Sequence, residues 1–475
     1  MYRFRKIEHI LGKYKELENQ EIYFAPPEDL NDPMEGYRDI FWKGDEIVWK
    51  NFIINYVRSL EFTFMVIILY GFEKRLTNDD ILVSPQVEAY QKLPKKQFFK
   101  EILDVVFQDD FIKNLPKSLA NRKNAIRRFE LISYLEFIHP NVLNIITNLY
   151  YEKGLSKHPF FASDPKEMHK IIQETGNMVE LTDLLEKEYE QIENVADKVF
   201  NIAGWNRDQM NLIALFNSKE KSTTPNTVFL ISEYPTRFVS QLETIIYPNW
   251  YCASFLSENE NSAVWGHYGD RHRGVCLKFK TDTNEEKESI HLETEFGYSS
   301  GPMIGMRPHA FKKVNYQSKH VEIDFFRSIG RMSKIIIEHL WYKDESGNFS
   351  ECGSHLKEGR EEWRNTYWEN HDKSITTKLK EWEYENEYRL ILTGDFVDYT
   401  KKDSRKLKYD FKTLESITFG INTSDEDKIK IIRIIEEKCK TQKRKEFDFY
   451  QAYYSKDDGK IKSYKLSLIK FEQVG

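Results

Sequence analysis

Cysteine is scarce in this sequence, and several signatures of catalytic or metal-binding proteins are absent. The 475 residues include four cysteines, and no two of them form a Cys-x-x-Cys pair. This excludes a disulfide scaffold and a zinc knuckle, and it is typical of a reducing compartment. Walker A, Gly-x-Gly-x-x-Gly, Gly-x-Ser-x-Gly and His-Glu-x-x-His motifs are also missing. The sequence therefore does not support a P-loop NTPase, a Rossmann enzyme, a serine hydrolase of the elbow type or a zincin.

Long apolar runs are also lacking. The most apolar run extends from Phe62 to Phe72, whereas crossing a bilayer takes roughly 20 residues. We expect a buried helix there, and the first residues, Met-Tyr-Arg-Phe-Arg-Lys, have no apolar signal core. The sequence therefore predicts a cytoplasmic protein with no membrane partner. A net charge of −6 argues against nucleic-acid binding by the whole surface, but it does not exclude a local basic groove.

Apolar residues are present in sufficient number for large cores. They make up 40% of the chain, and aromatic residues make up 14%. The hydrophobic pattern divides the chain into three parts. Residues 1–45 and 241–475 alternate like strands, and residues 46–240 have the spacing of helices. We predict an α+β core built from the two outer parts, with strands from both sharing one sheet, and a mostly helical insertion between them.

Individual elements follow from the same periodicities. The helical spacing in the insertion is clearest for Leu181, Leu184, Leu185, Tyr189, Ile192, Val195 and Val199, which predict one amphipathic helix. Further helices are expected over 341–380 and 427–439. Strands are expected over 2–5, 21–24, 250–256, 274–280, 387–393 and 414–420, and two more within 447–468.

Two stretches collect the side chains that carry chemistry. The first lies between two predicted strands and contains Trp265, His267, Tyr268, Asp270 and His272. Its aromatic residues have an alternative reading as core or cleft-wall residues. The five-residue histidine spacing is a poor fit to a helical zinc site, so no metal is expected.

The second stretch, Trp382 to Leu392, contains Glu383, Glu385 and Glu387 at a period of two. Carboxylates at this period lie on one face of a strand, where they can polarise hydroxyls, share a proton or bind a cation. A solvated strand end is the alternative. Similarly, Asn31 and Asp32 could line a cleft or form an Asx-turn before proline.

Three motifs in order resemble the DUF2971 family of uncharacterised bacterial proteins. They are Tyr2-Arg3-Phe4 with Phe24 to Glu35, then Cys252 to Ser257 with Val264 to Cys276, and finally Trp382 to Arg389. The resemblance covers roughly residues 1–45 and 245–470 and leaves the helical insertion unexplained.

An arginine on the first strand, a serine on a middle strand and a late Glu-x-Glu are also similar to the Arg-Ser-Glu arrangement of ADP-ribosyltransferases. That similarity implies a split β-sheet cleft that binds NAD as a substrate. It implies Glu387 on the ribose hydroxyl, Glu385 toward the acceptor, and Ser254 or Ser257 as support. Arg3 or Arg5 would bind the diphosphate and Tyr268 or Trp265 the nicotinamide, with His267, Asn31 and Asp32 lining the site.

The resulting hypothesis is an NAD-consuming effector or toxin, in bacterial defence against phage. Its acceptor would be a protein or nucleic acid, its trigger a phage component or partner protein, and the helical insertion could mediate oligomerisation. One alternative is a non-enzymatic sensor or binding module. Another is a metal-dependent nuclease using Asp32, Glu35, Asp270, Glu385 and Glu387, with Lys312, Lys313, Arg271 and Arg273 on phosphates.

Overall fold

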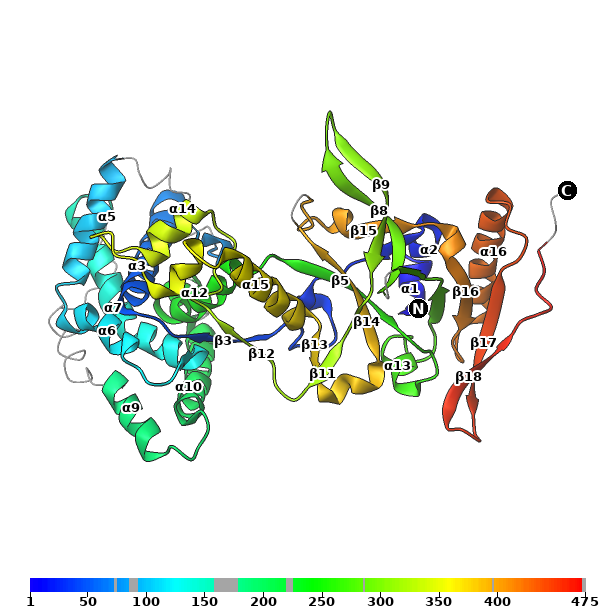
Figure 1. The fold of residues 1–475 in the computed structure, drawn as a ribbon, viewed down its shortest axis with the longest axis horizontal. Coiled ribbons are helices and arrows are strands. Elements are labelled where there is room, and N and C mark those ends of the chain that lie inside the picture. The colour runs from blue at the N-terminus through cyan, green and yellow to red at the C-terminus, as the bar shows by residue number, and fades with distance from the viewer. Residues whose placement is uncertain are drawn as a thin grey trace. The chain divides into compact units, whose positions relative to one another are not determined.

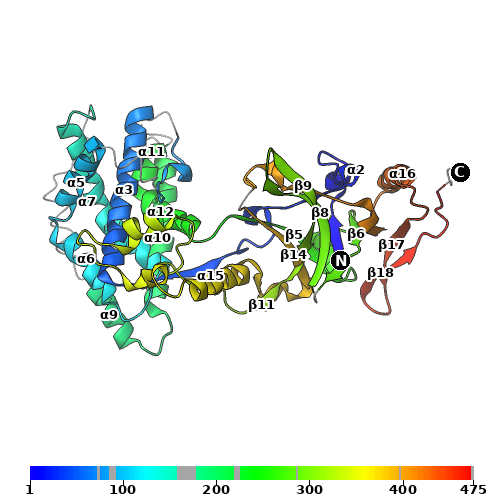
Figure 2. The same cartoon turned by 45° about the horizontal axis from the view of Figure 1, so that its top comes forward.

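A computed structural model of the chain describes residues 1–71, 75–84, 93–157, 178–218, 225–284, 287–394 and 397–471. The chain is a mixture of helices and β-sheets, and it forms two compact units (Figures 1 and 2). The first, here called the sheet unit, consists of residues 1–38, 249–321 and 371–475. The second, here called the helical unit, consists of residues 39–248 and 322–370.

The main sheet of the sheet unit joins strands from distant parts of the chain. Its order is β10-β14-β5-β1-β6-β16-β17-β18, and neighbours are antiparallel except β16 and β17. The prediction that strands from both outer parts share one sheet is therefore confirmed. The bounds are β10 (Lys312–Lys313), β14 (Glu387–Thr393), β5 (Trp250–Leu256), β1 (Tyr2–Arg5), β6 (Val275–Phe279), β16 (Leu414–Phe419), β17 (Asp448–Ser455) and β18 (Lys460–Lys465).

A second sheet shares the hydrophobic core of the first. It has the order β2-β15-β8-β7, with β9 paired to β8, and a two-stranded sheet joins β11 and β13. Ile22, Leu292 and Leu407 from the second sheet pack in one cluster with Phe255 and Leu277 from the first. Their bounds are β2 (Glu21–Tyr23), β15 (Lys406–Tyr409), β8 (Lys287–Tyr298), β7 (Asp282–Asn284), β9 (Pro302–Ala310), β11 (Asn315–Gln317) and β13 (Thr377–Leu379).

Short helices complete the sheet unit. Ile431 and Ile435 of α16 (Asp425–Thr441) enter the shared core, and the Ser424 side chain caps this helix by accepting from Asp427 N. The others are α1 (Ile7–Ile10), α2 (Glu16–Asn19), α13 (Ser262–His267) and the short turns η1 (Pro27–Asp29), η7 (Lys380–Glu385), η8 (Lys402–Arg405) and η9 (Phe411–Thr413).

The helical unit is built around two long helices, α3 (Glu46–Tyr70) and α7 (Arg128–Glu152). The Asp45 side chain caps α3 by accepting from Val48 N at 3.2 Å. Around them lie α5 (Leu93–Val106), α6 (Asp110–Ala120), α9 (Met178–Glu188), α10 (Val195–Ser218), α11 (Pro225–Val228), α12 (Tyr234–Leu242), α14 (Lys334–Ile337), η2 (Asn78–Asp80), η3 (Phe229–Glu233), η4 (Glu243–Ile245), η5 (Glu338–Tyr342) and η6 (Glu351–Leu356). A small sheet joins β12 (Val321–Asp324), β3 (Arg38–Trp42) and β4 (Ile126–Arg127), and α15 (Arg360–Ile375) runs from residues of this unit into those of the sheet unit.

Helix α3 contains most of the apolar run noted in the sequence. Within the described ranges it is the helix long and apolar enough to cross a membrane, and 61% of its most apolar window is buried inside the structure. Its Phe52, Tyr56 and Leu60 are almost fully buried. Within the predicted run, Phe64, Val66 and Ile67 are buried as expected, whereas Leu69 and Tyr70 are exposed and Phe72 lies outside the described residues.

Two expectations about the helical part need correction. The single helix predicted from Leu181 to Val199 is wrong, because α9 ends at Glu188 and α10 begins at Val195, after Asn194 takes a left-handed φ of 53°. Residues 322–370 also pack with the insertion, although their sequence position placed them in the core. Aromatic contacts are the reason, because the Phe325 ring lies tilted against Trp42 and the Phe326 ring edge-on to Trp49, with ring centroids 5.7 and 5.0 Å apart.

The strand expected over 387–393 is confirmed as β14 (Glu387–Thr393), but Glu383 and Glu385 precede it. Residues Lys380–Glu385 form η7, and Asn386 has a left-handed φ of 47° before β14 starts at Glu387. The three carboxylates therefore do not share a strand face. Residue Glu383 is exposed, while Glu385 and Glu387 are buried.

Candidate functional site

A cavity of about 350 Å³ opens in the sheet unit where β14, β5 and β1 lie side by side. Leu256 of β5 is opposite both Glu387 of β14 and Tyr2 of β1. This register brings Glu387 and the residue after Tyr2, Arg3, to the same part of the sheet. The volume of the cavity is in the range of small-molecule sites. The side chains that line it include Arg3, Arg5, Lys6, His9, Tyr14, Glu16, Tyr23, Asp29, Asn31, Glu35, Cys252, Ser254, His267, Tyr268, Lys378, Glu387 and Lys402.

Arg3 has an unmet hydrogen-bond donor at this cavity. The residue is 4% exposed, and its Nη2 donates to Tyr23 O at 2.9 Å. Its Nη1 is buried and has no hydrogen-bond partner among the described residues. Burial, and then the nearby Arg5, lower the pKa of Arg3. A buried guanidinium that lacks a partner is costly, so an anion bound in the cavity would be stabilised there.

Arg5 contrasts with Arg3. Both Nε and Nη2 of Arg5 donate to the carboxylate of Glu16, with Nε 2.7 Å from Oε2. This bidentate pair already satisfies Arg5. Of the two arginines that the sequence proposed for a diphosphate, Arg3 is the one with a free donor.

Two cations hold Glu387 in place. Arg389 donates through Nε to Oε1 and through Nη2 to Oε2, both at 3.0 Å, and Lys378 Nζ donates to Oε2 at 2.9 Å. Burial alone would raise the pKa of Glu387, but Arg389 and Lys378 outweigh it and lower the pKa to about 2. The carboxylate is therefore ionised at neutral pH and can still accept a hydrogen bond from a ligand.

Lys378 of β13 joins the other acidic groups to the same cluster. Its Nζ donates to Glu385 Oε2 at 2.8 Å and lies 3.7 Å from Glu35 Oε2. Glu35 also pairs with Arg389, whose Nη1 is 2.6 Å from Oε1. Burial opposes the charged lysine, yet the surrounding acidic groups, Glu387 first, raise the pKa of Lys378. The cluster is thus a closed set of charges rather than free carboxylates.

Local backbone geometry brings these acidic residues together. The turn at Asn386 lets Glu385 and Glu387 reach the same lysine from a short helical turn and from a strand. Gly36 follows Glu35 with a φ of 68°, and a Cβ there would meet the Trp250 ring at 2.6 Å. A side chain at position 36 would therefore displace the segment that presents Glu35.

Several residues proposed from the sequence lie together at the cavity. Arg3, Arg5, Asn31, Ser254, His267, Tyr268 and Glu387 all line it. The Tyr268 hydroxyl donates to Glu385 Oε1 at 2.6 Å. Burial, with Glu385 adding to it, raises the pKa of Tyr268, so this tyrosine is a neutral donor.

Four other proposed residues are not among those lining the cavity within the described chain. Ser257 is exposed beyond the end of β5, and Glu385 is turned to Lys378 and Tyr268. Trp265 is fully buried with its ring edge-on to Phe4, the centroids being 4.8 Å apart. Asp32 Oδ1 accepts from Met34 N at 2.9 Å, which is the Asx-turn that the sequence left open.

Two contributors to the site were not proposed as site residues from the sequence, although Lys313-Val314-Asn315-Tyr316 resembles the Val-x-Tyr strand of the DUF2971 family. Lys378 lies in a charge-rich stretch that reads as a solvated helix face, and no local pattern marks it as buried. Tyr316 of β11 accepts a hydrogen bond from Glu387 N at 2.9 Å. The pairing of β10 with β14 and of β11 with β13 joins segments far apart in sequence and brings these residues beside Glu387.

The described residues show no group of three or more His, Cys, Asp or Glu side chains that could hold a metal ion. The acidic residues Glu35, Glu385 and Glu387 do converge, but Lys378 and Arg389 occupy the space between them. Fixed cations in this position leave little attraction for a divalent cation.

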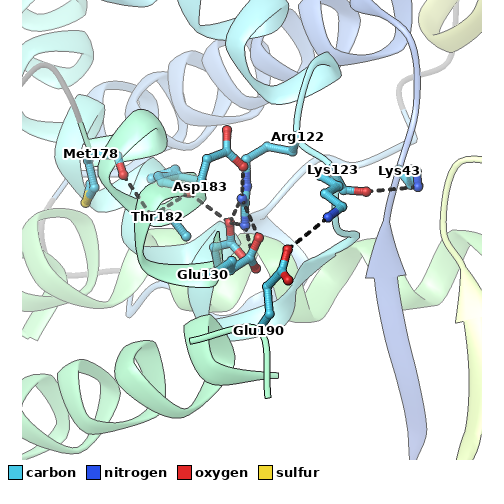
Figure 3. Close-up of polar contacts among 10 residues, drawn as sticks. Lys43, Arg122, Lys123, Glu130, Met178, Thr182, Asp183 and Glu190 are labelled. Atoms are coloured by element: carbon cyan, nitrogen blue, oxygen red, sulfur yellow. Dashed lines mark hydrogen bonds and ion pairs between the residues drawn. The ribbon is translucent and has the colours of Figure 1, made fainter. Parts of the chain in front are cut away.

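The helical unit contains a larger cavity of about 720 Å³, which is lined by many charged groups. Figure 3 shows the residues beside it, where Arg122 contacts Glu130 and Asp183. Arg122 also donates to both oxygens of Glu186, at 2.8 and 3.0 Å. Burial raises the pKa of Glu130 to about 7, because it outweighs the lowering by Arg122. Every nitrogen of Arg122 has an acceptor, so this cluster ties α7 and α9 to the end of α6.

A family model described as "Protein of unknown function (DUF2971)" matches residues 264–390. This match supports the DUF2971 resemblance over those residues. The matched residues include Tyr268, Lys378, Glu385, Glu387 and Arg389, which form the charged cluster, whereas Arg3 and Ser254 lie outside the match. No curated protein and no solved structure matches the chain. Because the DUF2971 description names no activity, function must be argued from the cavity.

Proposed function

We propose that the cavity of the sheet unit binds NAD and that the protein is an ADP-ribosyltransferase-like enzyme that cleaves the nicotinamide–ribose bond. One observation carries the proposal. Arg3, Ser254 and Glu387 come from three adjacent strands and line one cavity, and Arg3 presents an unmet buried donor there. A dinucleotide supplies the diphosphate that Arg3 lacks.

Arg3, Glu387 and Tyr268 would each have a separate role in cleavage of the nicotinamide–ribose bond. Arg3 pairs with the diphosphate, and the Glu387 carboxylate accepts a hydrogen bond from a ribose hydroxyl. As the C1′–N bond breaks, nicotinamide leaves with the bonding electrons, and the ribose gains oxocarbenium character. The fixed negative charge of Glu387 stabilises that cation, and Tyr268 offers an aromatic surface to the leaving ring.

A nucleophile of the acceptor then forms a bond to C1′ and loses its proton. Glu385 was expected to take this proton, but its contacts are with Lys378 and Tyr268. Glu35 lines the cavity, and burial raises its pKa despite Arg389. Glu35 is therefore the better placed group to receive the proton. The acceptor is a water molecule, a protein or a nucleic acid.

The test is incubation of the purified protein with NAD, with and without cell lysate, while nicotinamide release and ADP-ribose transfer are measured. We expect release by the wild type and a loss of roughly 10²–10³-fold in Glu387→Gln, because a preorganised charge at the reacting centre is removed. Glu383→Gln is the matched control, since Glu383 is exposed in the preceding turn. Absence of release by the folded wild type, or full activity in Glu387→Gln, contradicts the proposal.

The biological role that we propose is that of an effector or toxin in bacterial anti-phage defence, since unregulated turnover would deplete NAD. Expression of the wild type in bacteria should then slow growth and lower cellular NAD, and Glu387→Gln should do neither. Full growth with unchanged NAD would remove the support for this role.

A second candidate is a non-enzymatic nucleotide sensor. It is favoured by the closed charge cluster, in which both oxygens of Glu387 are already held by Lys378 and Arg389. Calorimetric binding of NAD or ADP without any nicotinamide release would support the sensor over the enzyme. EDTA separates both from a nuclease, because only the nuclease would lose its activity.

A further inference from the structure

Helix α10 of the helical unit carries large apolar side chains that are exposed. Between 45% and 69% of the surface of each is accessible, although the same helix packs against α7 through other residues. This exposed set, here called the α10 face, consists of Val199, Ile202, Trp205, Met210, Leu212, Ile213 and Phe216.

The area of the α10 face is large for a monomer. Large side chains present about 150–250 Å² each, so the face exposes roughly 800 Å². Monomeric soluble proteins rarely expose a contiguous apolar patch beyond roughly 300–600 Å². A standard protein–protein interface buries about 800 Å² on each partner. The α10 face therefore supplies the area that one partner of a stable complex needs.

The net charge of α10 indicates whether its apolar face binds a protein or a membrane. Helices that lie on membranes carry many Lys and Arg residues on the polar face. From Val195 to Ser218 the charged residues are Asp197, Lys198, Arg207 and Asp208, so the helix has no net charge. Arg207 is already paired with Glu136. A neutral helix does not attract anionic lipid, and it also does not repel a second copy of itself.

The spacing along the face fits self-association. Ile202, Trp205, Gln209, Leu212 and Phe216 follow one another at intervals of three and four residues, the spacing of a coiled-coil seam. With Gln209 at the centre, two antiparallel copies place Ile202 against Phe216 and Trp205 against Ile213. Such a twofold interface is self-complementary. Gln209 can both donate and accept, so two such side chains satisfy each other at the axis.

We propose that α10 is a dimerisation helix that packs antiparallel against α10 of a second copy of this chain, with Gln209 at the twofold axis. The inference is independent of the function proposed for the sheet unit. Of the apolar pattern that the sequence shows from Leu181 to Val199, Val199 belongs to the α10 face.

The first test is the molar mass of the full chain by sedimentation or light scattering at micromolar concentration. We expect a dimer for the wild type and a monomer for Leu212→Glu, with the dissociation constant raised on the order of 100-fold or more, because an unpaired charge would be buried. Ile335→Glu is the control, since Ile335 is 76% exposed on α14 of the same unit and lies off the face. A monomeric wild type, a wild type that binds lipid vesicles instead, or a dimer unaffected by Leu212→Glu overturns the proposal.

The second test locates the axis and does not depend on weakening the dimer. All four native cysteines are buried, so a cysteine introduced at the surface is the reactive thiol. Mild oxidation should link two chains of Gln209→Cys through one disulfide, because equivalent residues meet at a twofold axis. Ser346→Cys, at an exposed turn of the same unit, should not cross-link. Equal cross-linking of the two variants would contradict the assigned axis.

Discussion

Arg122 of the helical unit and Arg3 of the sheet unit are both buried, but of these two guanidinium groups only Arg122 is fully paired. Arg122 of the helical unit donates from all three nitrogens to carboxylates. Arg3 of the sheet unit uses Nη2 on a backbone carbonyl and leaves Nη1 without a partner among the described residues. Burying a charge without a partner costs folding free energy, and a complete set of partners compensates that cost. The comparison therefore separates a structural ion cluster from a group that a ligand completes.

Cavity size alone would have led to the opposite assignment. The cavity beside Arg122 has about 720 Å³, and the cavity at Arg3 has about 350 Å³. The larger one is lined by charges that already bind one another. The smaller one contains the unmet donor and an ionised carboxylate that is held by Lys378 and Arg389. The function proposed above therefore rests on incomplete pairing and not on volume.

Removal of Arg122 should produce the largest effect on folding. Arg122→Leu leaves Glu130 and Glu186 buried without their cation, so we expect the free energy of unfolding to fall by about 3–5 kcal/mol. Urea denaturation, followed by hydrogen exchange in peptides of α6, α7 and α9, measures it. Lys123→Leu is the control, because its ion pair with Glu190 is exposed and contributes less than about 1 kcal/mol. Equal losses in both variants would remove the distinction between them.

Removal of Arg3 should have the opposite consequence. Arg3→Leu relieves an unpaired buried charge, so the stability of the sheet unit should stay unchanged or rise. Binding of NAD should weaken by about 10–100-fold, the loss of one charge-assisted hydrogen bond of about 1.5–3 kcal/mol. Calorimetry and thermal unfolding measure the two effects. Arg5→Leu should instead lower stability, because it leaves Glu16 buried alone. If Arg3→Leu destabilises as much as Arg5→Leu, Arg3 is structural.

The smallest expected effect is a difference in pH dependence between the units. Glu387 has a pKa of about 2, lowered from 4.5 because Arg389 and Lys378 outweigh burial. Its stabilisation is present above pH 4.5 and is lost as the pH falls toward 2. Burial raises the pKa of Glu130 from 4.5 to about 7, so its stabilisation is present below pH 4.5 and is lost as the pH rises through 7.

Acidification from neutral pH to pH 4.5 should therefore stabilise the helical unit, and further acidification should destabilise the sheet unit. Hydrogen exchange resolved by peptide measures both units in one sample. Glu130→Gln should abolish the first change and Glu387→Gln the second. Parallel pH profiles for the two units would show that the two carboxyls do not differ in this way.

Strands were the elements that the sequence predicted best. The bounds of β5 and β14 agree with the expected 250–256 and 387–393, because alternating and apolar residues there are followed by clear breaks. Helix α16 was also expected, with bounds close to 427–439. The break between α9 and α10 was not, since Asn194 continues a helical pattern in sequence and only its left-handed backbone ends it.

The site was also predicted only in part, because local sequence patterns do not show contacts between distant segments. The residue types and the order of the motifs indicated Arg3, Ser254 and Glu387, and all three line the cavity. The sequence could not choose Arg3 over Arg5, because the choice depends on the ion pair between Arg5 of β1 and Glu16 of α2. Nor could it find Lys378, whose burial arises from strand pairing between distant segments.

The discontinuous path of the chain through the sheet unit has a consequence for synthesis. Arg3 is translated among the first residues, whereas Glu387 and its partner Arg389 emerge after the whole helical unit has been made. Domains generally fold as they leave the ribosome, but β1 must wait for β5, β6 and β14 before its side of the cavity exists. A nascent or prematurely terminated chain consequently has no assembled cavity. Only a chain translated past Glu387 can bring the two sides of the cavity together.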